Sequence, residues 1–369
     1  MTNREKLLST LRYEPGAELP IAHFGYWKET VRKWTEEGHV RESESWDEIS
    51  RRLGFDLHYA GVHCYGGPAD QLFPPFEEKV LKTLPDGSMH VFSKQGVIEL
   101  FKPGVVSIPT EIGHTLTDRG SWEREYLPRL QFSQERISKE AVQKAAEIRD
   151  RGEVFSYYAG SLYGSIRNWF GIVGLSYATE DDPGLVDEVI RTVGELEVKR
   201  AEMVLETAKE LGLSFDLMHF WEDICFNKGP LVNPAVFAEK VGPYYKKITD
   251  LGKAHGVGIF SVDCDGKIDE LVPIWLENGV NTMFPIEVGT WNGSIAPWRE
   301  KYGKRLLGVG GMDKRAFACD RTAVDSEIER LKPLVALGGY IPCPDHLIPP
   351  DGKFELVQYY CEKMRRTFT

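Results

Sequence analysis

The stretch Val257-Gly258-Ile259-Phe260-Ser261-Val262-Asp263-Cys264-Asp265-Gly266 predicts the fold class of the chain. Its apolar run, residues 257–260, follows a helix that we expect to stop near His255-Gly256, because glycine commonly ends helices. The run therefore predicts a buried strand that ends in three consecutive ligand-type side chains, at positions 263–265. In α/β proteins, ligands bind at the carboxyl ends of such strands. The alternative interpretation is that these acids only cap the following helix.

The same unit recurs along the chain, because strand-like apolar runs alternate with helix-like segments about eight times. The candidate strands are Leu19–Phe24, Phe55–Tyr59, Val154–Tyr157, Phe215–His219, Val257–Phe260, Thr282–Pro285, Leu306–Val309 and Gly339–Pro342. Strands separated by helices predict a parallel sheet. Eight units in one chain of 369 residues favour an eight-stranded (β/α)8 TIM barrel, as a single domain over residues 1–369. An open doubly wound sheet is the alternative, but neither GxGxxG nor a Walker-type glycine loop follows any candidate strand.

Residues 79–120 break this alternation. Short alternating runs there are joined by Pro85-Asp86-Gly87, Lys94-Gln95-Gly96 and Lys102-Pro103-Gly104. Such segments are typical of hairpin turns. The pattern predicts a β-rich insertion at about residues 79–120.

Composition excludes several classes of protein. The net charge of −11 argues against a nucleic-acid or anionic-membrane partner. No run of about 18 apolar residues suggests a membrane span, and the first residues lack the apolar core of a signal peptide. The six cysteines form no CxxC pair, so we expect a reduced, cytoplasmic protein that binds a small molecule.

Side chains suited to chemistry follow most of the candidate strands, and in a barrel they would all face one pocket. Those predicted to bind substrate are Trp27, His58, His219, Trp221 and Glu287, and those predicted to act as acids or bases, or to orient a ligand, are Glu222, Asp223 and His346. The tryptophans suggest an aromatic-lined pocket. The alternatives are that the acids are solvated and that the aromatic residues belong to the core.

Metal binding is the sharpest chemical prediction. Zinc takes cysteine, histidine and carboxylate ligands, and a catalytic site leaves one position open. The predicted ligands are three of Asp263, Cys264, Asp265, Cys343 and His346. A hydrogen-bonded polar pocket without metal is the alternative, because no short spacing such as HExxH is present.

Several segments resemble the uroporphyrinogen decarboxylase superfamily. They are Arg4–Leu8 leading to Leu19–Ile21, Gly229–Pro234 after Glu222-Asp223, Lys253–Val257 with the turn at Gly266, and Gly338–Ile341 with Asp345-His346 and Pro349-Pro350. The resemblance covers almost the whole chain and is best in its C-terminal half. It implies a (β/α)8 barrel with one of two activities: decarboxylation of a porphyrinogen without cofactor, or zinc-dependent methyl transfer involving a corrinoid protein.

The chain departs from both patterns of the family. The decarboxylases hold substrate carboxylates with an arginine pair after the first strand, whereas residues 24–29 contain no arginine. The methyltransferases hold zinc with a His-x-Cys turn and a cysteine in the last loop. These fall on Val262-Asp263-Cys264 or Asp263-Cys264-Asp265, and on Cys343 or His346. The resemblance therefore favours a methyltransferase with altered ligands, acting on a donor such as an aromatic methyl ether, with cobalamin carried by a partner protein. A decarboxylase of a less acidic substrate is the second hypothesis, with His346 as the proton donor.

Overall fold

Eight parallel strands form the centre of the molecule. The computed structural model describes residues 1–59, 71–105 and 109–368. The parallel strands are β1 (Ala22–His23), β2 (Leu57–His58), β7 (Ser156–Tyr158), β8 (Leu217–Trp221), β11 (Phe260–Asp263), β12 (Thr282–Ile286), β13 (Leu307–Met312) and β14 (Tyr340–Pro344). Six of them pair in the order β14-β13-β12-β11-β8-β7, and β1 pairs separately with β2.

The two sheets meet along β1 and β14. These strands are in contact, and just beyond them Tyr26 and Ile348 form a parallel bridge in which the Trp27 amide donates to the Ile348 carbonyl oxygen (3.1 Å). Among the described residues, no strand pairing links β2 with β7. The predicted parallel α/β sheet is thus confirmed, whereas the closure of all eight strands into one barrel stays a prediction.

A small hydrophobic cluster fills the space inside the strands. Its members from the strands alternate along the chain, as side chains on one face of a sheet do. It comprises Leu7, Leu8, Leu11, Ala22, Phe24, Leu57, Tyr59, Val154, Leu217, Ile259, Phe284, Leu307, Val309, Ile341 and Cys343. We call this set the inner cluster. It defines which side chains of each strand point inward.

Helix α1 (Asn3–Leu11) covers the amino-terminal ends of the strands. Thr2 and Glu5 form its capping box, as its sequence suggests. The Arg4 guanidinium binds the Asp216 carboxylate just before β8 (2.7 Å), and the Arg4 amide donates to the Gly152 carbonyl oxygen before β7 (2.8 Å). Because α1 occupies this end, the carboxyl ends of the strands are left to form a site.

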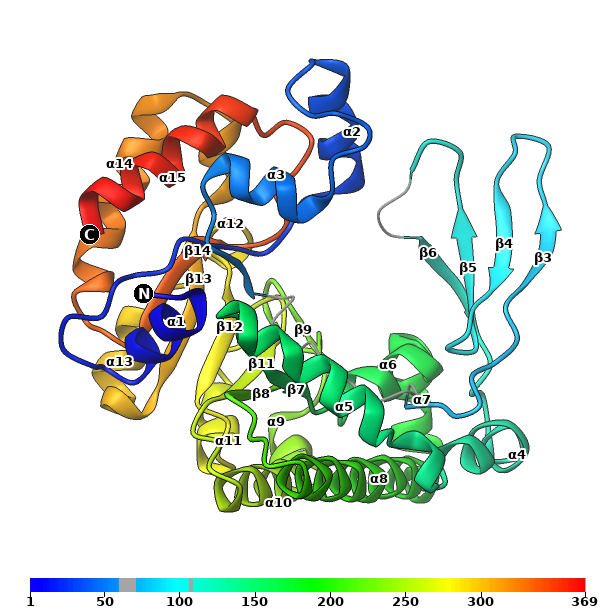
Figure 1. The fold of residues 1–369 in the computed structure, drawn as a ribbon. Helices are drawn as coiled ribbons and strands as arrows, with labels where there is room; N and C mark the ends of the chain where they lie inside the picture. Colours follow the sequence, from blue (N-terminus) through cyan, green and yellow to red (C-terminus); the bar gives the residue numbers. More distant parts are fainter. Residues whose placement is uncertain (60–70, 106–108, 369) are drawn as a thin grey trace.

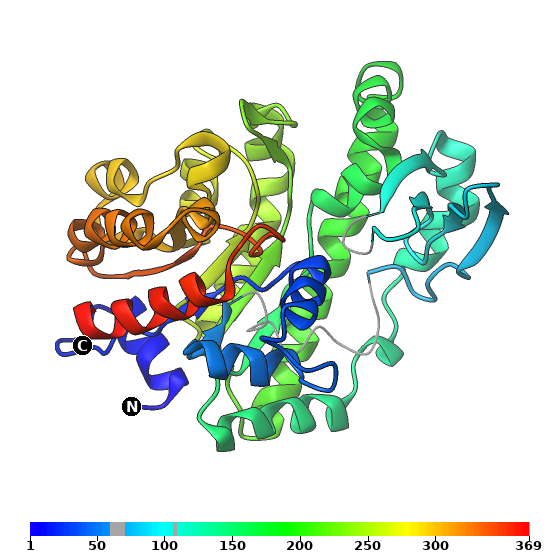
Figure 2. The same ribbon diagram turned by 90° about the horizontal axis from the view of Figure 1, so that it is seen from above.

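The remaining helices surround the strands (Figures 1 and 2). They are α2 (Lys28–Glu36), α3 (Trp46–Leu53), α4 (Arg119–Ser121), α5 (Lys139–Ala146), α6 (Gly164–Phe170), α7 (Ile172–Asp181), α8 (Pro183–Glu210), α9 (Pro234–Val236), α10 (Gly242–Ala254), α11 (Val272–Glu277), α12 (Val288–Trp291), α13 (Ile295–Tyr302), α14 (Arg321–Val335) and α15 (Phe354–Phe368). Their buried faces make up a second, larger hydrophobic cluster, which we call the outer cluster. No helix in the described part of the chain is long and apolar enough to cross a membrane.

The predicted β-rich insertion is present as a separate antiparallel sheet. Its strands are β3 (Lys79–Thr83), β4 (Met89–Phe92), β5 (Val97–Phe101) and β6 (Thr110–His114), paired in that order. It stands at one side of the molecule (Figure 1), where His114 Nδ1 lies 2.9 Å from the Asn168 carbonyl oxygen of α6. A short hairpin of β9 (Cys225–Phe226) and β10 (Gly229–Pro230) follows β8.

Candidate functional site

A histidine–aspartate pair lies at the carboxyl ends of the parallel strands. His346 follows β14 and Asp265 follows β11, and His346 Nε2 is 3.2 Å from Asp265 Oδ2. The His346 ring stacks on Phe24 at 4.7 Å between centroids, and Phe24 stacks on Phe284 at 4.8 Å. Both phenylalanines belong to the inner cluster, so the pair sits directly above the apolar interior. The chain segments that follow β11 and β14 therefore bring these two side chains together.

Three further carboxylates surround the pair. Burial raises the pKa of Asp263 well above its usual range, and the charges of Asp265, Asp223 and Glu287 raise it further. Burial and then Asp265 likewise raise the pKa of Glu287, whose carboxylate accepts from the Gly266 amide (2.6 Å). Each ionised carboxylate disfavours a further negative charge beside it, so an anionic substrate would meet the same repulsion that raises the pKa values of Asp263 and Glu287. We call Asp223, Asp263, Asp265 and Glu287 the acidic cluster.

Asp223 connects the acidic cluster to helix α6. The Arg167 guanidinium of α6 lies 3.0 Å from the Asp223 carboxylate. Burial raises the pKa of Asp223 most, with Asp265 acting in the same direction, while Arg167 and His346 lower it. The backbone of Asp223 has φ 44°, in the left-handed region that non-glycine residues seldom adopt. Such an imposed conformation fits a side chain that has a fixed task at a site.

Glu222, predicted as an acid or base, is completely buried. Its carboxylate accepts from the amides of Leu162 (2.8 Å), Tyr163 (2.9 Å) and Gly164 (2.7 Å). The hydroxyls of Ser161 (3.2 Å) and Tyr245 also donate to it. A carboxylate that accepts five hydrogen bonds has no room for substrate, so Glu222 fixes the 161–164 turn that opens α6.

The predicted substrate-binding residues Trp221, His219 and Trp27 differ in their depth within the strands and in their exposure. Trp221 pairs with Asp263 in the β8–β11 ladder, so both side chains lie on the inner face. His219 lies one inward position deeper and is 1% exposed, with its ring 6.2 Å from those of Tyr59 and Phe284. Trp27 is partly exposed at the start of α2.

The two cysteines predicted as zinc ligands lie on opposite faces of the strands. Cys264 belongs to the outer cluster, where the Ile224 amide lies 3.4 Å from its sulfur, and Cys343 belongs to the inner cluster. Burial raises the pKa of both thiols. In the described part of the chain, no three His, Cys, Asp or Glu side chains are grouped to hold a metal ion. The two thiols are therefore not placed to bind one metal ion together.

His58, predicted to bind substrate, is directed away from the acidic cluster. Its Nε2 lies 2.6 Å from the Phe24 carbonyl oxygen, and its ring stacks on His23 at 4.8 Å. Burial lowers the pKa of His58 and lowers that of His23 well below the usual value, with His58 adding to the shift at His23. Both rings are therefore neutral parts of the β1–β2 packing.

These two neutral histidines predict a loss of stability on mild acidification. Below about pH 6.5 an unfolded histidine takes up a proton, whereas the folded protein, with its lowered pKa values, does not. The free energy of unfolding therefore falls as the pH drops below this value. Each of the two histidines contributes up to about 1.4 kcal/mol per pH unit to the fall. Urea unfolding of the wild-type and His23→Gln proteins at several pH values measures the effect. We expect a smaller pH slope in the variant, and equal slopes would contradict the prediction.

Three residues near the site were not assigned to it from the sequence: Arg167, Tyr163 and Phe24. Tyr163 lies directly before the short helix α6 and Arg167 lies within it, and their partners, Glu222 and Asp223, are distant in the chain. Phe24 was counted only as part of a strand. Alternation along the first strand was the one available signal, because it places Phe24 on the same face as Ala22 of the inner cluster.

Comparisons with known proteins identify the fold. No protein-family model matches the chain, and no curated protein matches it. Its structure is similar to that of a methyltransferase from Methanosarcina mazei, with 13% sequence identity, a TM-score of 0.58, and coverage of 100% of this chain and 99% of that chain. A B12-independent methionine synthase from Shewanella sp. W3-18-1 in complex with selenomethionine gives 13% identity, a TM-score of 0.47, and coverage of 95% and 99%. The chain therefore shares the overall α/β fold of the Methanosarcina mazei protein.

Proposed function

We propose that the chain is a cytoplasmic methyltransferase that moves a methyl group between a small methylated substrate and the cobalt of a partner corrinoid protein. The observation that carries the proposal is the His346–Asp265 pair (3.2 Å), held above an aromatic floor at the carboxyl ends of the strands. The fold shared with a methyltransferase supports it, as does the sequence resemblance. An aromatic methyl ether is the donor that the resemblance and the aromatic floor suggest.

The chemistry that this pair supplies is proton transfer. When a methyl ether gives up its methyl group, the oxygen–carbon bond breaks and its electron pair stays on oxygen. The acceptor's electron pair forms the new bond to the methyl carbon, and the oxygen needs a proton to leave as a neutral alcohol or phenol. His346 would donate that proton, and Asp265, 3.2 Å from its Nε2, would orient the ring.

The charge of the acidic cluster limits the substrate class. The acidic cluster lies around the His346–Asp265 pair, and Arg167, which contacts one of its members, is already paired with Asp223. A substrate with several carboxylates would be repelled. This argues against a porphyrinogen and leaves neutral or cationic methyl donors. The second hypothesis is decarboxylation of a less acidic substrate, with His346 as the proton donor. The experiment must distinguish this reaction from methyl transfer.

The experiment supplies the purified chain with reduced cobalamin as a probe acceptor and with a panel of methyl ethers, thiols and amines. We expect methylcobalamin, seen by its absorbance, together with one equivalent of the demethylated product. No methylcobalamin with any donor would contradict the proposal. Release of carbon dioxide from a carboxylated analogue would favour the decarboxylase instead.

Zinc stays a prediction of the sequence. If the protein binds it, Asp265 and His346 are the predicted ligands that already lie 3.2 Å apart, whereas Cys264 faces the outer cluster. Elemental analysis of protein purified without chelator measures the content. About one zinc per chain that is lost in His346→Ala would support the prediction, and a metal-free active protein would contradict it.

A further inference from the structure

The aspartate that directly precedes His346 ties together the ends of three strands. Asp345 follows β14 and is completely buried. Its Oδ2 accepts from the amides of Val288 and Gly289 after β12 (2.8 Å each), and its Oδ1 accepts from the Lys314 amide after β13 (3.2 Å). The Lys314 ammonium lies 3.5 Å from Oδ1. One side chain therefore fixes the segments that follow β12 and β13 against the segment that carries His346.

Glu287 fixes the other member of the pair, Asp265, in a similar way. Its side chain is almost completely buried, its Oε2 accepts from the Gly266 amide (2.6 Å), and its Oε1 accepts from the Thr290 hydroxyl (2.8 Å). Gly266 directly follows Asp265 and has φ 87°, which favours glycine. A Cβ at this position would lie 2.7 Å from the backbone of Cys225, so the turn is packed tightly as well as hydrogen-bonded.

The two buried carboxylates meet in the segment that follows β12. This segment contains Glu287 itself and the two amides that Asp345 binds, so hydrogen bonds of 2.6 to 2.8 Å connect the turn after β11 with the loop after β14. The direct contact between His346 Nε2 and Asp265 Oδ2 is longer, 3.2 Å, and its side chains are 18% and 35% exposed. The buried connection therefore determines the separation of the pair more firmly than the direct contact does.

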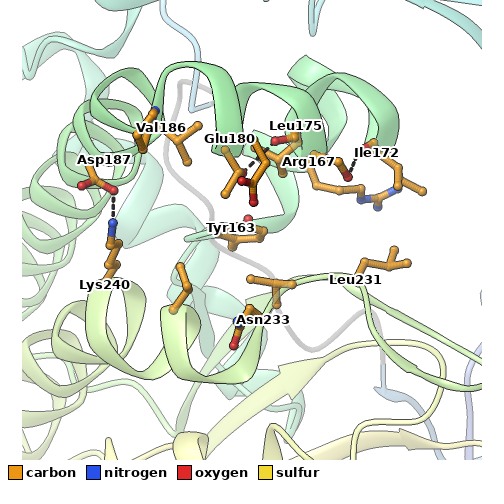
Figure 3. Close-up of a pocket in the computed structure, with 15 residues that line it drawn as sticks. Tyr163, Arg167, Ile172, Leu175, Glu180, Val186, Asp187, Leu231, Asn233 and Lys240 are labelled. Atoms are coloured by element: carbon orange, nitrogen blue, oxygen red, sulfur yellow. Dashed lines mark hydrogen bonds and ion pairs between the residues drawn. The ribbon is translucent and has the colours of Figure 1, made fainter.

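The part of the site around Asp223 is packed less firmly. Asp223 is bound by Arg167 of α6 (3.0 Å), and Arg167 also lines a cavity of about 330 Å³. The cavity lies between the helices α6, α7 and α8 on one side and residues 231–240 on the other (Figure 3). Atoms that line a cavity lack packing partners on one side. The firm reference for the histidine–aspartate pair is therefore the segment after β12 and not α6.

We propose that Asp345 and Glu287 are positioning residues, which set the distance and orientation of the His346 ring relative to Asp265. The hydrogen bonds described above occupy both oxygens of each carboxylate, so neither residue needs to touch the substrate. For Glu287 this role takes the place of the substrate contact predicted from the sequence. The catalytic consequence rests on the proposed function, whereas the geometric role does not.

The first measurement follows the His346 ring by NMR of protein labelled with ¹³C-histidine. The ring stacks on Phe24 at 4.7 Å, so the ring current of Phe24 displaces the signals of the carbon-bound His346 ring protons, which the His346→Gln protein identifies. In Asp345→Asn an NH2 group faces a backbone amide donor in either orientation, and we expect the signals to move toward those of an unstructured histidine. Asp216→Asn is the matched control and should leave them in place. Asp216 is also buried and accepts from a backbone amide and a guanidinium, but it lies before β8, at the amino-terminal ends of the strands.

The second measurement is a double-mutant cycle in the methyl-transfer assay. Because a small misplacement of a reacting group is costly, Asp345→Asn should lower kcat about 10- to 100-fold and change KM by less than about twofold. In the His346→Gln protein the group to be positioned is gone, so adding Asp345→Asn should cause little further loss. A further loss of the same size in that background would overturn the proposal, because Asp345 would then act on the rate independently of His346.

Unmoved His346 signals in a folded Asp345→Asn protein would also overturn the proposal, whatever its activity. Circular dichroism and thermal melting establish that each variant is folded. If Asp345→Asn does not fold, Glu287→Ala releases the Gly266 amide, and with it the ring's partner Asp265, and the same signals must then move. The two proposals fail separately. Signals that move as expected in a protein without methyl transfer would keep the positioning role and remove the proposed function, and methyl transfer with unmoved signals would do the reverse.

Discussion

Replacing His346 with glutamine is expected to lower the rate of methyl transfer from an aryl methyl ether by about 10²- to 10⁴-fold. Glutamine keeps a polar side chain beside Asp265 but cannot give up a proton to the leaving oxygen. The His346 side chain is 18% exposed and stacks on Phe24, so thermal melting must show that the variant is folded. The rate of methylcobalamin formation, measured at saturating ether, reports the effect.

The dependence of the rate loss on the leaving group distinguishes a proton donor from a merely structural residue. If His346 were only structural, the loss would not depend on the acidity of the departing phenol. Ethers of more acidic phenols need less help from a proton donor, because the departing phenolate is already stable. We therefore expect the loss caused by His346→Gln to shrink for a nitro-substituted aryl ether. An equal loss for all ethers would contradict the role of proton donor. His39→Gln, at a partly exposed position on the surface, is the matched control and should retain the rate.

The alternation of strands and helices was enough to predict the parallel sheet, because burial patterns are local properties of the chain. The residue at which a strand begins was less predictable, as β11 shows. The apolar run at 257–260 marks burial, but the Val257 amide donates to Gly252 and so still belongs to the end of α10. The strand itself begins at Phe260, where the register with β8 starts. Closure into a barrel depends on contacts between distant strands, which periodicity does not contain.

The candidate site was predictable where it depends on strand ends. Asp265 and His346 are 81 positions apart, yet both follow parallel strands and they meet. Cys264 was included with them as a ligand, although side chains alternate along a strand and a position between two inward residues faces outward. That signal was present in the sequence. Arg167 was not predictable, because its pairing with Asp223 depends on how α6 is turned by Glu222.

Glu222→Gln is expected to lower the free energy of unfolding by about 2–4 kcal/mol. Two donors bind one carboxylate oxygen of Glu222 and three bind the other. In either orientation the glutamine NH2 group replaces one oxygen and faces at least one backbone amide that has lost its acceptor. Each buried donor left unsatisfied costs about 1–3 kcal/mol. Urea unfolding measures the change, and Glu202→Gln, on the exposed face of α8, should cost less than about 1 kcal/mol.

The same variant separates a structural from a catalytic role for Glu222. Gly164 packs so tightly on this residue that an added Cβ would lie 1.9 Å from the Glu222 carbonyl oxygen, so the 161–164 turn cannot shift to rescue the lost hydrogen bonds. A catalytic Glu222 would instead give a stable protein without activity. Asp223→Asn supplies the contrast, because Asp223 is partly exposed and meets Arg167 at the surface of the site. We expect it to change the rate with little change in stability. A Glu222→Gln protein as stable as the wild type would therefore return Glu222 to the acid–base role that its position after β8 first suggested.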